Sequence, residues 1–70
     1  MHLIELIEQL KSRREVLGVT QMHLAEMSGV GLRTLKELES GKSNPTFETL
    51  SRLAEVLGME LKLEVKHPKL

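Results

Sequence analysis

Four short segments of this chain, each followed by a glycine, carry apolar residues at the three- and four-residue spacing of a helix. A glycine just past the last periodic residue often ends a helix, because glycine adopts a positive φ without steric cost. Threonines precede the second and fourth segments, where a hydroxyl oxygen can accept a hydrogen bond from a free backbone N–H. The sequence therefore predicts four helices, over residues 3–17, 21–28, 32–40 and 47–57.

The pattern changes after Gly58. Charged residues now alternate, as far as residue 66, with the apolar residues Met59, Leu61, Leu63 and Val65, which predicts a half-buried strand over residues 59–66. A single strand leaves its backbone N–H and C=O groups unpaired, and the chain offers no second strand. We therefore expect these four apolar residues to form a dimer interface, in a two-stranded sheet shared by two copies.

The expected fold class is mainly α: a four-helix domain over residues 1–58, one dimerising C-terminal strand over 59–66 and a tail over 67–70. Without cysteine, the 70-residue chain has no disulfide framework. No apolar stretch approaches the length of a membrane span, and the start lacks the basic region of a signal peptide, so we expect a cytoplasmic protein. The net charge of zero is unusual for a nucleic-acid binder, so phosphate contacts must come from a local basic cluster.

The second and third predicted helices are joined by a minimal turn. Ala25 is small where the third helix must approach the second, and Gly29 supplies the positive φ of the turn. Val30, Leu35 and Leu38 can pack the crossing from the other side. This pattern is typical of a helix-turn-helix, in which two helices cross steeply rather than lie side by side.

The sequence resembles the lambda-repressor-like helix-turn-helix family (Cro/C1, XRE-type), from about residue 6 to residue 58. The residues that carry the resemblance are Thr20-Gln21, Leu24-Ala25, Gly29-Val30 and Leu38-Glu39-Ser40-Gly41-Lys42. The resemblance implies that the third helix lies in the major groove of DNA and that the second helix braces the phosphates. One residue departs from the family pattern: Gly31 stands where Ser or Thr usually caps the third helix.

Carried onto this sequence, the resemblance assigns base reading to the outer positions of the third helix, Leu32, Arg33, Lys36 and Glu37. Arg33 suits guanine through two hydrogen bonds, Leu32 can touch a thymine methyl group, and Glu37 can accept from cytosine N4. For Glu37 an ion pair with Arg33, one helical turn before it, is an equally good interpretation.

Phosphate contacts are expected at the start of the second helix and beyond the third. Gln21 lies where a side-chain amide and free backbone N–H groups converge on an anion. Thr34 can add a hydroxyl group, and Lys42, Ser43 and Asn44 follow the third helix. Each of these residues alone is more often a solvated polar side chain, and the resemblance places them on one surface.

Arg14 falls within the apolar stripe of the first helix, in line with Leu10 and Leu17. The resemblance implies that Arg14 pairs with Glu39 and that this pair is structural. The alternative is a surface arginine whose aliphatic stem covers apolar neighbours while its charge stays in water.

No metal, cofactor or catalytic site is expected. His2, His23 and His67 are too scattered for a metal motif, and no serine has a nucleophile signature, so we expect no enzyme. The leading hypothesis is a transcriptional repressor that binds a palindromic DNA operator as a homodimer. The strand after the helices resembles antitoxins of HipB type, which implies a HipA-like kinase toxin as a further partner.

A protein-interaction module that keeps the fold without specific DNA binding is the alternative. The neutral net charge favours it, and Arg33, Lys36 and Lys42 on the expected DNA surface speak against it. The two hypotheses differ in whether the chain binds DNA with a strong dependence on salt.

Overall fold

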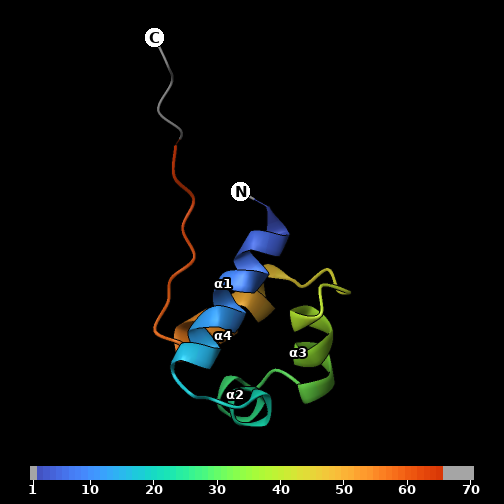
Figure 1. The fold of residues 1–70 in the computed structure, drawn as a ribbon. Helices are drawn as coiled ribbons and strands as arrows, with labels where there is room; N and C mark the ends of the chain where they lie inside the picture. The colour runs from blue at the N-terminus through green and yellow to red at the C-terminus, as the bar shows by residue number, and fades with distance from the viewer. Residues whose placement is uncertain (1, 66–70) are drawn as a thin grey trace.

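The computed structural model describes residues 2–65 and contains four helices: α1 (Leu3–Val16), α2 (Gln21–Ser28), α3 (Leu32–Glu39) and α4 (Phe47–Val56) (Figure 1). Each predicted helix is confirmed, and three of them end one residue earlier than expected. No helix in the described part of the chain is long and apolar enough to cross a membrane.

The ends of the helices follow the expected local chemistry. The hydroxyl oxygen of Thr20 accepts a hydrogen bond from the backbone N–H of His23, and that of Thr46 accepts from Thr49, both at 3.1 Å. The glycines that follow the four helices all have positive φ, between 69° and 78°. Gly31, which precedes α3, provides no side-chain cap, so the free N–H groups of that helix end stay available.

The helices pack around one apolar core. Helix α2 contacts both α3 and α4, and α1 contacts α3. Leu38 of α3 and Leu53 of α4 are fully buried at its centre. The core consists of Ile7, Leu10, Leu24, Ala25, Val30, Leu35, Leu38, Leu50, Leu53, Ala54 and Leu57.

Several apolar side chains at helical spacing within the predicted helices are exposed rather than buried, among them Leu17, Met27 and Phe47. Leu17 and Met27 are 46% and 47% exposed, and Phe47 is 72% exposed. Phe47 is the first residue of α4, and the core meets this helix only from Leu50 onward. The one phenylalanine of the protein, which has no tyrosine or tryptophan, therefore lies on its surface.

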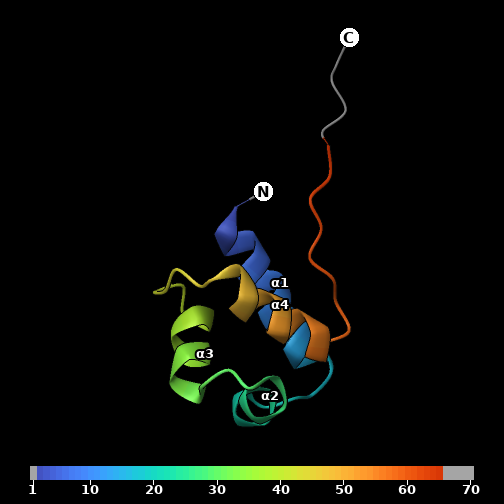
Figure 2. The same cartoon turned by 180° about the vertical axis from the view of Figure 1, so that it is seen from behind.

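After Gly58 the chain runs as an extended tail along the side of the molecule opposite α3, as both views show (Figures 1 and 2). The predicted strand is not found: residues 59–65 form no strand pairing, and residues 66–70 lie outside the described part. A strand is defined by hydrogen bonds to a neighbouring strand, which residues 2–65 do not supply. Met59 and Leu61 pack against the core, whereas Leu63 and Val65 are 98% and 92% exposed.

Candidate nucleic-acid interface

The turn between α2 and α3 fixes how α3 is presented. Gly29 ends α2 with a φ of 77°, and its N–H donates to the carbonyl oxygen of Ala25 at 3.0 Å. Val30 is buried in the core, and its N–H donates to the hydroxyl oxygen of Ser28 at 3.2 Å. Because the turn is both hydrogen-bonded and anchored by a buried side chain, α3 crosses α2 at a defined angle.

Helix α3 has an apolar inner face and a charged outer face. Leu35 and Leu38 are buried, while Arg33, Lys36 and Glu37 are exposed. The Arg33 side chain is 93% exposed, and its Nε atom lies 3.4 Å from Oε1 of Glu37. In the free protein, therefore, Glu37 forms the ion pair with Arg33 that was predicted as the alternative to contact with a base.

Leu32 differs from its expected position on the outer face of α3. Its side chain is half-buried and packs against the core. Only part of its surface remains available to a thymine methyl group, whereas the side chains of Arg33 and Glu37 are 93% and 51% exposed.

The expected phosphate-binding residues fall into two groups. Thr34, Lys42 and Asn44 are exposed and can meet a DNA backbone directly. Gln21 is half-buried, and the hydroxyl oxygen of Ser43 is buried without a hydrogen-bond partner among the described residues. The Ser43 hydroxyl must therefore turn outward, by a change of its rotamer or of its loop, before it can reach a phosphate.

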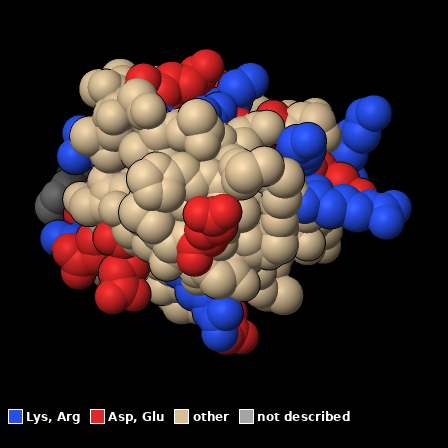
Figure 3. Space-filling view, turned by 90° about the horizontal axis from the view of Figure 1, so that it is seen from below, with Lys and Arg blue, Asp and Glu red and all other residues tan. Residues whose placement is uncertain are grey.

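Several basic side chains project on the side of the molecule where α3 lies. Seen from below, they lie on that side with acidic side chains between them, other basic side chains lie elsewhere around the rim, and the middle of the face is mostly uncharged apart from one acidic group (Figure 3). Arg33 and Lys36 on α3, and Lys42 after it, supply exposed positive charge in this part of the sequence. A chain with zero net charge thus has a local basic surface of the kind that phosphate binding requires.

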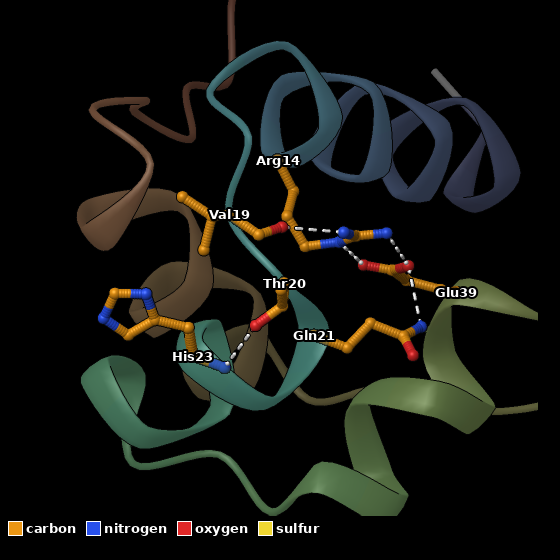
Figure 4. Close-up of polar contacts among 6 residues, drawn as sticks. All are labelled: Arg14, Val19, Thr20, Gln21, His23 and Glu39. Carbon is orange, nitrogen blue, oxygen red and sulfur yellow. Dashed lines mark hydrogen bonds and ion pairs between the residues drawn. The ribbon is translucent and has the colours of Figure 1, made fainter.

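Arg14 of α1 and Glu39 of α3 form a bidentate ion pair (Figure 4). Arg14 donates from Nε to Oε2 of Glu39 at 2.7 Å and from Nη2 to Oε1 at 2.9 Å. The two side chains are only 12% and 4% exposed. The hydrogen bond to Glu39 raises the pKa of Arg14 above its ordinary value, although burial alone would lower it.

The same carboxylate holds the start of α2. Oε1 of Glu39 also accepts a hydrogen bond from Nε2 of Gln21 at 3.0 Å, and Nη1 of Arg14 donates to the carbonyl oxygen of Val19 at 2.8 Å (Figure 4). Glu39 thereby joins the end of α1, the start of α2 and the end of α3. This network fixes the position of Gln21, whose amide oxygen accepts no hydrogen bond from the described residues.

Two further contacts were not predicted from the sequence. Nε of Arg13 donates to the carbonyl oxygen of Leu57 at 3.0 Å, just beyond the end of α4, across 44 positions of sequence. No local pattern could have revealed it. Arg52 and Glu48 form an ion pair at 2.7 Å on the exposed face of α4, and their four-residue spacing is a signal that could have been recognised in the sequence.

Among the described residues no cluster has the composition of a metal site.

Comparison with known proteins identifies the class of fold. The helix-turn-helix family profile matches residues 10–63, so the chain belongs to this family. The family resemblance inferred from the sequence is thereby confirmed, whereas the narrower likeness to HipB-type antitoxins is not shown.

Three relatives carry names of transcription regulators. A helix-turn-helix-type transcriptional regulator of Haemophilus influenzae is 37% identical over 60 residues, 86% of this chain and 61% of the relative. The cryptic phage CTXphi transcriptional repressor RstR of Vibrio cholerae is 33% identical over 54 residues, 77% of this chain and 48% of the relative. Another helix-turn-helix-type regulator, from Methanothermobacter thermautotrophicus, is 39% identical over 51 residues, 73% of this chain and 74% of the relative. This chain therefore covers less than two thirds of the first two relatives.

Proposed function

We propose that this protein is a sequence-specific transcriptional repressor that binds a palindromic DNA operator as a homodimer. The observation that carries the proposal is the outer face of α3, where exposed Arg33 and Lys36 project from a helix whose inner face is locked into the core. Membership of the helix-turn-helix family and the repressor named among the relatives support this function.

The proposed dimer uses the tail. In a two-fold antiparallel pair of tails centred on Leu63, Lys62 of each copy faces Glu64 of the other, and Leu61 faces Val65. Glu60 then faces Lys66, which lies outside the described residues. Moving the centre by one residue would oppose like charges, which is unfavourable, and a centre on Leu61 also matches charges but pairs fewer residues. Two recognition helices about 34 Å apart would fit successive major grooves.

We expect Arg33→Ala to weaken binding to the operator by about 1–3 kcal/mol and to relax the preference for one base pair in each half-site, because a bidentate arginine–guanine contact is lost. The measurement is a fluorescence-anisotropy titration with a duplex selected from a randomised pool and with its single-base variants. An equal loss of affinity on every duplex would contradict a base-reading role for Arg33.

Lys42→Ala serves as the matched comparison, because it removes one exposed positive charge outside the recognition helix. We expect affinity to fall by a similar factor on all duplexes, and the slope of log affinity against log salt to become shallower by about one unit per copy. An unchanged slope would show that Lys42 does not contact a phosphate.

A DNA-independent interaction module is the second candidate, favoured by the zero net charge. It predicts that the chain binds no duplex in preference to another and that its binding depends little on salt.

An antitoxin role is a narrower form of the repressor proposal, in which a HipA-like kinase encoded beside this gene would be a second partner. Co-purification of such a kinase with this chain supports that role, and two proteins that elute separately would exclude it.

A further inference from the structure

An apolar groove lies between the tail and the helical body. It encloses about 330 Å³ and is lined by Leu6, Phe47, Leu50, Leu61, Lys62 and Leu63. Leu6 comes from α1, Phe47 and Leu50 from α4, and the last three residues from the tail. Lys62 is the only charged side chain among them, so the groove suits an apolar occupant.

The sides of this groove are unusually exposed for apolar residues. Phe47 is 72% exposed and Leu63 is 98% exposed, whereas Leu50 is buried beneath them. Val65, two positions further along the tail, is 92% exposed. Contiguous exposed apolar surface of this kind marks an interaction site, and an aromatic side chain at its edge is typical of interface anchors.

We infer that the occupant is a second copy of this chain, whose Val65 enters the groove beside Phe47. This inference rests on the tail pairing of the proposed function. It adds the groove as the surface that receives the tail of the second copy. In the register centred on Leu63, the partner's Val65 lies directly opposite Leu61. Leu61 packs against the core at the floor of the groove, so the partner's Val65 is brought over the same floor.

Charge supports the same occupant and the same register. Lys62 lies at the edge of the groove, and in this register it meets the partner's Glu64, which neighbours the partner's Val65 in the sequence. The apolar side chain therefore enters the groove while its charged neighbour pairs at the edge. By symmetry, Val65 of the first copy occupies the groove of the partner, and the interface has two equivalent halves.

The inference extends the dimer interface from the tail to the start of α4. Phe47 directly follows the loop of residues 42–46, which contains three of the expected phosphate-binding residues. The surface that joins two copies and the loop that approaches DNA are therefore neighbours in the chain. Occupation of the groove would hold the first turn of α4, to which this loop is attached.

The test is sedimentation equilibrium of the full-length chain carrying Phe47→Ala, compared with Val16→Ala. Val16 is also apolar and 75% exposed, and it lies at the opposite end of α1 from Leu6. We expect Phe47→Ala to raise the dimer dissociation constant by roughly tenfold or more and Val16→Ala to leave it unchanged. Circular dichroism should show both variants folded, since neither side chain belongs to the core.

A cross-linking measurement gives an independent readout, because the natural chain contains no cysteine. An equimolar mixture of Phe47→Cys and Val65→Cys chains should form a disulfide-linked dimer on mild oxidation, and each variant alone should form much less. Phe47→Ala dimers of unchanged affinity, together with no cross-link in the mixture, would overturn the groove and leave tail pairing standing. A wild-type chain that is monomeric at all concentrations would overturn both, whatever its affinity for DNA.

Discussion

Glu39→Ala is expected to lower the free energy of unfolding by about 3–5 kcal/mol, because it leaves the Arg14 guanidinium buried without its carboxylate. Among the described residues Arg14 would keep one hydrogen bond, to the carbonyl oxygen of Val19, and Gln21 would lose the acceptor of its amide. A domain of this size has a total stability of roughly 4–10 kcal/mol, so much of it depends on one carboxylate. Urea denaturation at a fixed protein concentration gives the measurement.

The chain contains a matched control for this prediction. Arg52 and Glu48 pair at the same 2.7 Å as Arg14 and Glu39, and their side chains are 53% and 72% exposed. Arg52→Ala should therefore cost only about 0–1 kcal/mol. The double substitution Arg14→Met with Glu39→Leu should be milder than Glu39→Ala, since no buried charge remains unpaired. If Glu39→Ala proves no worse than Arg52→Ala, the buried pair does not stabilise the fold.

Leu63→Glu is expected to convert the protein to a monomer and to weaken operator binding by about 10²–10⁴-fold, because a single copy engages one half-site and loses the gain from linked binding. In the proposed register this residue lies on the two-fold axis, where two carboxylates would then face each other. Leu63 is 98% exposed, so the helical core should be unaffected. Sedimentation velocity and an operator titration measure the two effects.

Val16→Glu is the control for this prediction, since it places the same charge at another exposed apolar position on the helical body. It should remain dimeric and bind the operator normally. A Leu63→Glu protein that sediments as a dimer would exclude tail pairing centred on this residue.

Local signals in the sequence predicted the helices well. A threonine cap or a terminal glycine acts on the backbone of its own segment. The roles of Thr20, Thr46 and Gly29 at the helix ends could therefore be predicted without knowledge of the packing. Periodicity failed where a residue lies on the apolar face of a helix but beyond the edge of the core. Phe47 is such a residue, because the core reaches α4 only from Leu50 onward.

Predicting the candidate site required information on contacts between helices as well as on the sequence of each helix. Helical spacing predicts which residues of α3 point outward, as the exposure of Arg33 and Lys36 shows. Spacing alone could not show that Leu32 packs against the core or that the Ser43 hydroxyl turns inward, because both depend on contacts between elements.

The structure of the tail likewise could not be predicted from its own residues alone. Alternation of apolar and charged residues predicts an extended chain, but a strand also needs a neighbouring strand, which the described residues do not supply.

The central claim, that this chain reads DNA through α3, is tested most directly by a salt-titrated binding measurement. The duplex is selected from a randomised pool with the full-length protein and compared with a scrambled duplex of equal composition. We expect the selected site to be palindromic and preferred over the scrambled one, with affinity falling by roughly tenfold or more between about 50 and 200 mM salt as condensed counterions are released less favourably. Equal, weak binding to both duplexes at every salt concentration would contradict the claim.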